Sequence, residues 1–157
     1  RDKDGVSAAV LFAELAASLR AANRTIWDEL FRIYQRYGYC GSAQQSITRK
    51  GPEGARELAQ MMATLRDTPP KKIADLAVLD TADYLTRSPG SDMLTFSLEG
   101  GHRVIARPSG TEPKAKIYFD VRVDLKDGQT LESAKAAAGA LIEGLRADML
   151  RLVGVSP

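Results

Sequence analysis

Cysteine and histidine are almost absent from this sequence, since its 157 residues contain one of each, Cys40 and His102. A single cysteine forms no disulfide within the chain, and one Cys with one His provides none of the ligand spacings of a zinc site. These two absences exclude a disulfide-stapled scaffold and a zinc-finger module. They favour a reducing, cytoplasmic location.

Long apolar runs are also missing. No stretch approaches the roughly 20 apolar residues that a helix needs to cross a bilayer, and no secretory leader is visible, so a membrane is not an expected partner. The chain has no initiator Met: it opens Arg1-Asp2-Lys3-Asp4-Gly5 and enters a helical pattern almost at once. We interpret this opening as a cut inside a longer protein.

An excess of charge of one sign is the third absence. Lys and Arg together number 22 against 20 for Asp and Glu, so the net charge is +2. Nucleic-acid and membrane-surface binders usually show a clustered basic excess, so nucleic acid is not an expected partner either. The remaining composition, 44% hydrophobic and 27% charged residues, is typical of a globular protein with one domain and part of another.

Two helical patterns open the chain. Apolar residues recur at helical spacing from Val6 to Ala22 and again from Ile26 to Tyr37. Thr25, with Asp28 three positions later, predicts the N-terminal cap of the second helix. No strand precedes these helices to accept their apolar faces. We therefore expect residues 1–38 to be a two-helix remnant of an α/β domain whose sheet lies upstream.

Residues 39–157 have the pattern of an α+β domain. The expected elements are a strand or connector at 39–49, a helix at 52–66, strands at 75–84, 93–98, 102–107 and 115–124, and a helix at 131–153. The residues of the two helices predicted to be buried are Ala55, Leu58, Met61, Met62, Leu65, Leu131, Ala134, Ala138, Leu141, Leu145 and Met149. We predict an antiparallel sheet of about four strands, with two helices covering one face.

The segment that suggests chemistry runs from Arg107 to Lys114 and reads RPSGTEPK. It joins two strands expected to form a hairpin, where loops of about 2–5 residues are usual. Gly110 can adopt a positive φ and turn backbone N–H groups inward to form an anion-binding nest. Ser109 and Thr111 add hydroxyl donors, and Arg107 adds a planar fork that matches two phosphate oxygens. This set of donors predicts a phosphate site.

The same residues also fit an ordinary turn, because Ser-Gly-Thr between prolines is common turn chemistry. Composition alone leaves the phosphate site and the plain turn equally probable. A carboxylate directed at a phosphate would repel it, so Glu112 is expected to point away.

Resemblance to a known family favours the phosphate site. The run Arg-x-Ser-Gly-Thr-Glu-Pro-Lys, within Val104 to Phe119, resembles the phosphate-binding loop and following strand of the fourth domain of α-D-phosphohexomutases. Arg1 to Ala9 resembles the segment that enters the last helices of that family's third domain. Gly51 to Gly54 and Pro69 to Tyr84 resemble the start of the fourth domain. The resemblance implies a TATA-binding-protein-like fold for residues 39–157.

The family includes phosphoglucomutase and phosphomannomutase, and it implies interconversion of hexose 1-phosphate and 6-phosphate through a bisphosphate such as glucose 1,6-bisphosphate. In the family a phosphoserine of the first domain transfers the phosphoryl group, with Mg²⁺ held by aspartates of the second. Neither motif is present here. The resemblance therefore implies a chain that is inactive alone and acts with the remaining domains of the same protein on a sugar phosphate.

The site residues follow from the same resemblance. Arg107, Ser109, Gly110 and Thr111 match the family's contacts to the phosphate that is not being transferred. Lys116 matches a basic position that often assists, and a solvated strand lysine is an equally good interpretation of it. No residue of this chain matches the family's catalytic serine or metal ligands.

Two other functions use the same features. A non-enzymatic phosphate-binding or phosphopeptide-binding module would need the same loop, but it would not explain helices that lack a sheet. A nucleic-acid or protein interaction domain is compatible with the TATA-binding-protein-like fold, although the charge balance disfavours it. His102, Trp27 and Cys40 are interpreted as structural residues.

Overall fold

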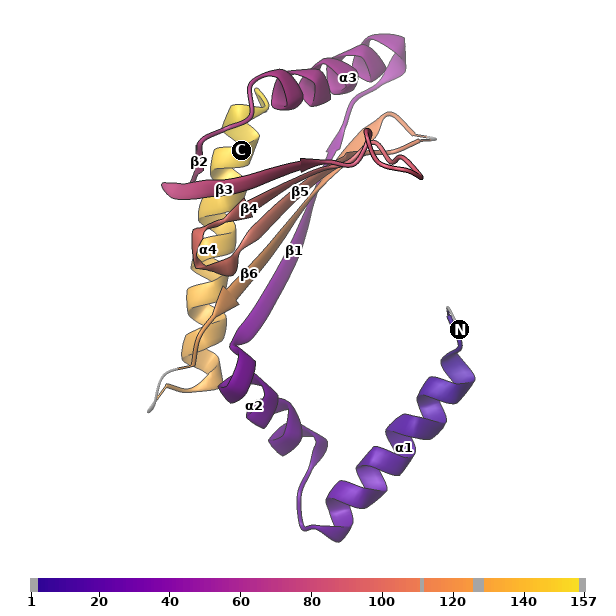
Figure 1. Cartoon of the computed structure of the whole chain (residues 1–157), viewed down its shortest axis with the longest axis vertical. Helices are drawn as coiled ribbons and strands as arrows, with labels where there is room; N and C mark the ends of the chain where they lie inside the picture. Colours follow the sequence, from indigo (N-terminus) through magenta and orange to yellow (C-terminus); the bar gives the residue numbers. More distant parts are fainter. Residues whose placement is uncertain (1–2, 111, 126–128, 156–157) are drawn as a thin grey trace.

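The computed structural model describes residues 3–110, 112–125 and 129–155. Its elements in chain order are α1 (Gly5–Ala21), α2 (Ile26–Tyr37), β1 (Tyr39–Thr48), α3 (Gly51–Asp67), β2 (Lys72–Ile73), β3 (Leu76–Asp83), β4 (Leu94–Leu98), the 3₁₀ turn η1 (Glu99–Gly101), β5 (Arg103–Pro108), β6 (Lys114–Val123) and α4 (Leu131–Leu152). Figure 1 shows a fanned sheet with α3 and α4 beside it. Helices α1 and α2 project away from the sheet at the N-terminal end of β1.

The sheet is antiparallel and has six strands in the order β1-β6-β5-β4-β3-β2. The sheet therefore has two strands more than the roughly four predicted. β2 was not predicted, since it is only two residues long. Residues 39–49 were interpreted as a strand or connector because they show no apolar stripe, and they form β1, which pairs with β6 from Tyr39 opposite Val123 to Thr48 opposite Lys114. The inward positions of β1 include Gly41, and a Cβ there would lie 3.1 Å from the Cβ of Ala138 on α4. Close approach of the helix thus requires a small residue where an apolar side chain would have revealed the strand.

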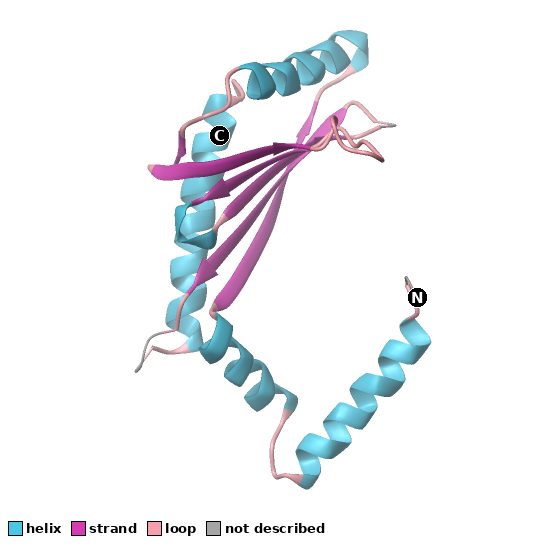
Figure 2. Ribbon diagram, in the orientation of Figure 1, coloured by secondary structure: helices cyan, strands magenta, loops and turns pink. Residues whose placement is uncertain are grey.

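Helices α3 and α4 cover one face of the sheet, as predicted, and Figure 2 shows no helix packed on the opposite face among the described residues. Apolar side chains from both helices and from alternate positions of the strands form one buried cluster. Its most deeply buried members include Phe96 and Phe119 on the sheet, Met62 on α3, and Leu145 and Met149 on α4. The α+β class with two helices on one face is confirmed.

The predicted helix faces need small corrections. Ala55 is exposed, and the buried position in the first turn of α3 is Gly54, one residue earlier. On α4, Leu131 and Leu141 are half-buried, whereas Ile142 is buried. The other predicted positions on both helices are buried, so the helical periodicity is right. At Ala55 and Leu141 the buried residue is the neighbour of the predicted one.

Helix α2 begins and ends where the sequence predicts. The Thr25 hydroxyl accepts a hydrogen bond from the Asp28 N–H at 3.1 Å, and the Asp28 carboxylate accepts one from the Thr25 N–H at 2.7 Å. Together they form a capping box that satisfies two helix-terminal donors. Gly38 ends the helix with φ 87°. The rings of Tyr34 and Tyr39 then meet edge to face at 5.1 Å and join α2 to β1.

Most large apolar side chains of α1 are left exposed by the described residues, and Leu19 is the buried exception. The exposed ones are Val6, Val10, Leu11, Phe12 and Leu15. Contiguous apolar surface of this kind usually belongs to an interface, which agrees with helices whose sheet lies elsewhere. The boundary between residues 1–38 and 39–157 stays a prediction.

Among the described residues, no single helix is long and apolar enough to cross a membrane. Helices α1 and α2 meet the length and composition criteria only when they are taken together, and they are bent by 94° at the break between them.

Two phenylalanines provide a matched test of the core. Phe119 is 0% exposed and Phe12 is 58% exposed. Phe119→Ala should lower the free energy of unfolding by about 3–5 kcal/mol, because it removes buried contacts and leaves a cavity. Phe12→Ala should change it by less than about 1 kcal/mol. Urea unfolding of the dilute chain measures both, and similar losses for the two variants would contradict this arrangement of the core.

Candidate functional site

The candidate loop connects β5 and β6, which pair as an antiparallel hairpin. The register of this pairing decides which face of the sheet the charged side chains of the two strands occupy. Arg107 on β5 lies opposite Lys116 on β6. On the same strands Ala106 and Ile117 are 0% exposed. Because side chains alternate across a strand, Arg107 and Lys116 both lie on the open face of the sheet, away from α3 and α4.

Hydrogen bonds close the loop on itself. The Ser109 N–H donates to the Lys114 carbonyl at 2.8 Å, and the Lys114 N–H donates to the Glu112 carbonyl at 2.7 Å. The Glu112 N–H donates to the Ser109 hydroxyl oxygen at 3.3 Å, which leaves the hydroxyl hydrogen of Ser109 able to donate. Thr111, the fifth predicted site residue, lies outside the described residues.

Gly110 differs from its predicted conformation. It does not adopt a positive φ, in contrast to Gly38 and Gly51, so the expected nest of inward-turned N–H groups is not formed through this residue. A Cβ at Gly110 would meet nothing within 4 Å. In this structure Gly110 therefore leaves space beside the loop, and it does not form a left-handed turn.

Four of the five predicted site residues, Arg107, Ser109, Gly110 and Lys116, line one hollow of about 310 Å³ on the open face. The remaining residues around it are Pro108, Glu112, Lys114 and Tyr118. Sequence reasoning did not include Tyr118 in the site. The alternation of β6 could have indicated it, because Tyr118 lies two residues after Lys116 and therefore on the same face.

The charges of this hollow are not all paired. Glu112 forms an ion pair with Lys114, and the hydrogen bond and charge of Lys114, together with the charge of Lys116, lower the pKa of the Glu112 carboxyl. Glu112 was expected to point away from a bound phosphate, but it lines the hollow, with its carboxylate paired to Lys114. Arg107 and Lys116 have no ion pair within the described residues, so the hollow presents two unpaired cations.

The other side of the loop is less suited to an anion. A hollow of about 500 Å³ lies there between the loop, α3 and the β3–β4 connection. Arg107, Ser109, Gly110 and Lys114 line this hollow as well, whereas Lys116 lines only the open-face one. The further cation here, Arg66, pairs with Asp83 at 3.1 Å and also with Asp92, a carboxylate that lines the same hollow. A phosphate would meet a fixed negative charge here. The open-face hollow is therefore the candidate anion site.

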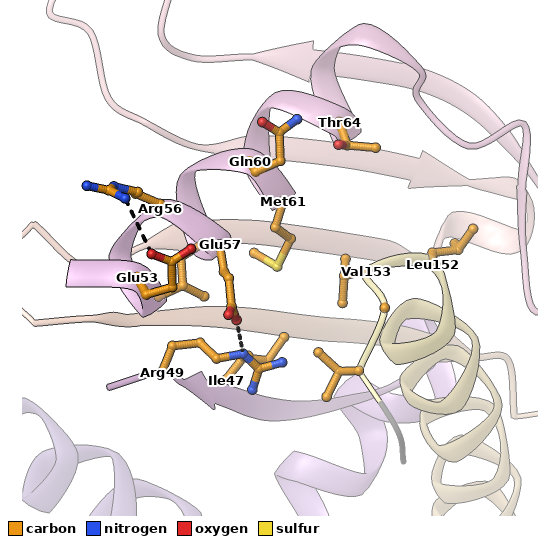
Figure 3. A pocket seen from close by; sticks show the side chains of 13 residues that line it. Ile47, Arg49, Glu53, Arg56, Glu57, Gln60, Met61, Thr64, Leu152 and Val153 are labelled. Atoms are coloured by element: carbon orange, nitrogen blue, oxygen red, sulfur yellow. Dashed lines mark hydrogen bonds and ion pairs between the residues drawn. The ribbon is translucent and has the colours of Figure 1, made fainter. Parts of the chain in front are cut away.

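The far end of the loop is fastened to the rest of the domain through Arg49. The Arg49 N–H donates to the Pro113 carbonyl at 3.0 Å. The Arg49 side chain bonds Glu57 on α3 at 2.9 Å, across the hollow that Figure 3 shows in close view. Gly54 is essential to this contact, because a Cβ there would lie 2.5 Å from the Arg49 Cβ. Tight packing of α3 against Arg49 thus positions the Pro113 end of the loop.

Three residues interpreted as structural lie outside the open-face hollow. His102 is buried, and its Nδ1 accepts a hydrogen bond from the Arg122 N–H at 3.2 Å, so a satisfied core histidine is confirmed. Trp27 is 74% exposed, and its expected packing role is not found within this chain. Cys40 showed no basic neighbour in sequence, but strand pairing places Arg122 opposite it, with the guanidinium bound to Asp124.

A metal site was not expected in this chain. Within the described ranges, no group of three or more His, Cys, Asp or Glu side chains is arranged to hold an ion. The described residues therefore offer no fit for the Mg²⁺ that the family resemblance implies.

The geometry defines an α+β domain with two cations at a hairpin loop, neither of them ion-paired within the part of the chain that the structure describes. Comparison with known proteins identifies its family: residues 57–138, about half of the chain, match the phosphoglucomutase/phosphomannomutase C-terminal domain. The chain belongs to the phosphoglucomutase/phosphomannomutase family and carries its C-terminal domain.

Individual relatives agree. A probable phosphomannomutase of Haemophilus influenzae is 38% identical over 146 residues, covering 93% of this chain and 28% of that protein. A phosphoglucomutase of Staphylococcus aureus is 34% identical over 136 residues, covering 78% of this chain and 24% of that protein. The chain therefore spans about a quarter of the length of these relatives.

The fold is also found in a solved structure. The crystal structure of the exocytosis-sensitive phosphoprotein pp63/parafusin, a phosphoglucomutase from Paramecium in its open form, matches with a TM-score of 0.60 over 98% of this chain and 28% of that one. Sequence identity is 20%, so this likeness shows the fold alone.

The contact between Gly54 and Arg49 leads to a test. Gly54→Ala should lower the free energy of unfolding by about 1–3 kcal/mol, because the new Cβ collides with the Cβ and backbone of Arg49. Gly139→Ala on α4 is the matched control: nothing lies within 4 Å of its Cβ, and a helical alanine should stabilise the chain by about 0.5–1 kcal/mol. Urea unfolding that ranks the two variants in the opposite order would refute the close packing at Arg49.

The buried histidine makes stability depend on pH. Burial lowers the pKa of His102 below its usual value, so the unfolded chain binds a proton more readily than the folded one. Stability from this group is complete above pH ~6.5, the unfolded value, and falls as the pH drops below it. The His102→Asn variant keeps an acceptor near Nδ1 without titrating. The free energy of unfolding of the wild type, relative to this variant, should therefore decrease between pH 8 and pH 5, and a constant difference would be contrary to expectation.

Proposed function

We propose that this domain binds the phosphate of a hexose phosphate that is not being transferred, as part of a phosphohexomutase of the phosphoglucomutase/phosphomannomutase type. The observation that carries the proposal is the hollow on the open face, where Arg107 and Lys116 lie next to Ser109 and Gly110 and have no ion-pair partner among the described residues. A doubly charged phosphate neutralises both cations and accepts hydrogen bonds from the guanidinium and the hydroxyl.

The energy available is sufficient for a useful affinity. Hydrogen bonds to charged groups contribute about 1.5–3 kcal/mol each. The loop is held at both ends, by the Ser109–Lys114 and Arg49–Pro113 hydrogen bonds, so little additional ordering of the backbone is needed on binding. Glu112 reduces the net positive charge of the hollow, but its pairing with Lys114 weakens its repulsion of the ligand.

A remote phosphate site supports catalysis by orienting the substrate. Binding energy gained far from the reacting group positions that group for reaction, so it contributes to the chemical step. In the proposed reaction the bisphosphate intermediate, glucose 1,6-bisphosphate for a glucose substrate, must turn around and present its other end. A hollow that recognises phosphate through charge accepts either end of the sugar.

The chemical step itself belongs to other parts of the longer protein in this proposal. A serine of another domain carries the transferred phosphoryl group, and Mg²⁺ held by another domain supports the transfer. This chain alone is then an isomerase domain without mutase activity, and its partners are the remaining domains and the sugar phosphate. A cytoplasmic location, where hexose phosphates occur, completes the proposal.

Two arginines on the same strand and face test the site. Arg107→Ala should weaken binding of glucose 1,6-bisphosphate by about 1–3 kcal/mol, because it removes a charge-assisted fork. Arg103→Ala is the matched control: Arg103 also lies on the open face of β5, but it is bound to Asp120 at 2.7 Å and does not line the hollow. Backbone amide shifts in an NMR titration measure both affinities and should move around Ser109 and Gly110.

Other results would change the assignment. Equal affinity of wild type and Arg107→Ala would refute the loop as the phosphate site. Binding of long DNA that weakens steeply with salt, without binding of glucose phosphates, would indicate the interaction-module alternative.

A further inference from the structure

Tyr118 is the only aromatic residue among those that line the open-face hollow. It is half-buried, its hydroxyl forms no hydrogen bond within the described residues, and it shares its face of β6 with Lys116 and Asp120. The hydroxyl is therefore available to donate to and accept from a ligand in the hollow. The phosphate site as described gives this tyrosine no role.

The register of the sheet places Tyr118 in a defined position relative to the cations. Across the open face, one row of cross-strand partners contains Arg107, Lys116 and Ser46. The next row, two residues farther along each strand, contains Tyr118 with two flanking residues, Ile105 on β5 and Gln44 on β1. Two residues of a strand span about 7 Å, so the second row begins about one sugar ring away from the cations.

The second row has the composition of a sugar-contacting surface. An aromatic ring can cover the apolar C–H face of a hexose, while its hydroxyl exchanges hydrogen bonds with the sugar. Gln44 provides an amide beside it: Nε2 donates to the Ser46 hydroxyl at 3.1 Å, and this bond leaves the amide oxygen available as an acceptor.

We propose that Tyr118, with Gln44 beside it, contacts the ring of the hexose whose phosphate is held by Arg107 and Lys116. This inference depends on the proposed function, and it adds a sugar-recognition element to a phosphate site. Contact with an aromatic face is weakly directional, so it tolerates a ring that has turned around. This tolerance is what a bisphosphate intermediate requires.

A purely structural role is the competing explanation. Aromatic and β-branched residues on neighbouring strands stabilise a sheet by cross-strand contact, and Tyr118 lies opposite Ile105. Such a role would affect stability, but it would not distinguish a sugar phosphate from inorganic phosphate. Comparison of these two ligands therefore separates the explanations.

The test is a pair of NMR titrations of the 157-residue chain, with glucose 6-phosphate and with inorganic phosphate, for the wild type and three tyrosine variants. Tyr118→Leu should weaken glucose 6-phosphate binding by about 2- to 12-fold, the loss expected for one aromatic contact, and should leave the affinity for inorganic phosphate unchanged. Tyr118→Phe keeps the ring and should lose less. Tyr37→Leu, an exposed tyrosine on α2, is the matched control and should bind both ligands like the wild type.

Three results would overturn the inference: a wild type that binds both ligands equally, a Tyr118→Leu variant that binds both like the wild type, or one that loses both in proportion. Thermal unfolding of each variant establishes that the titrated chain is folded. Failure of the phosphate site itself has a different signature, because Arg107→Ala would then leave both affinities unchanged. If Arg107→Ala weakens the binding of both ligands, the phosphate site is established. The Tyr118 variants then test the contact with the sugar alone.

Discussion

Strand β6 pairs along its length with β1 on one side and with β5 on the other, and its strict alternation constrains both faces of the domain. Every second residue from Ala115 to Val121 is buried against α3 and α4. The intervening residues must then face the open side. A shift of one residue in this register would expose the core and bury the charges. The hydrophobic core and the cationic hollow therefore depend on the same pairing.

The β5–β6 loop combines this constraint with a second one from α3. Pairing of β5 with β6 fixes its two ends, and the Arg49–Pro113 hydrogen bond fastens one end to the β1–α3 corner. Because Gly54 allows α3 to approach Arg49 closely, helix packing reaches the loop through one backbone contact. The charges of the loop are also set by contacts within it. Lys114 forms an ion pair with Glu112, and Arg107 and Lys116 have no ion-pair partner among the described residues. An anion-sized hollow with two available cations results from ordinary packing and pairing.

The two N-terminal helices have a different status. Their local chemistry is complete, with a capping box at Thr25 and a glycine at the end of α2, yet the large apolar side chains of α1 other than Leu19 are exposed. Capping and helical propensity specify where a helix begins and ends, but burial of its apolar face requires a partner. The relatives are between about three and four times as long as this chain, which provides room for such a partner.

Periodicity and local motifs in the sequence by themselves determined the helices, four of the six strands and the loop Arg107 to Lys114, because these features depend on neighbours a few residues apart. Only the tertiary structure decided that β1 is a strand, since small residues such as Gly41 fit under α4 and hide its alternation. It also decided that Gly110 has no positive φ, that Lys114 neutralises Glu112, and that Tyr118 joins the hollow. These outcomes depend on strand register and helix packing between residues far apart in sequence, which no local pattern encodes.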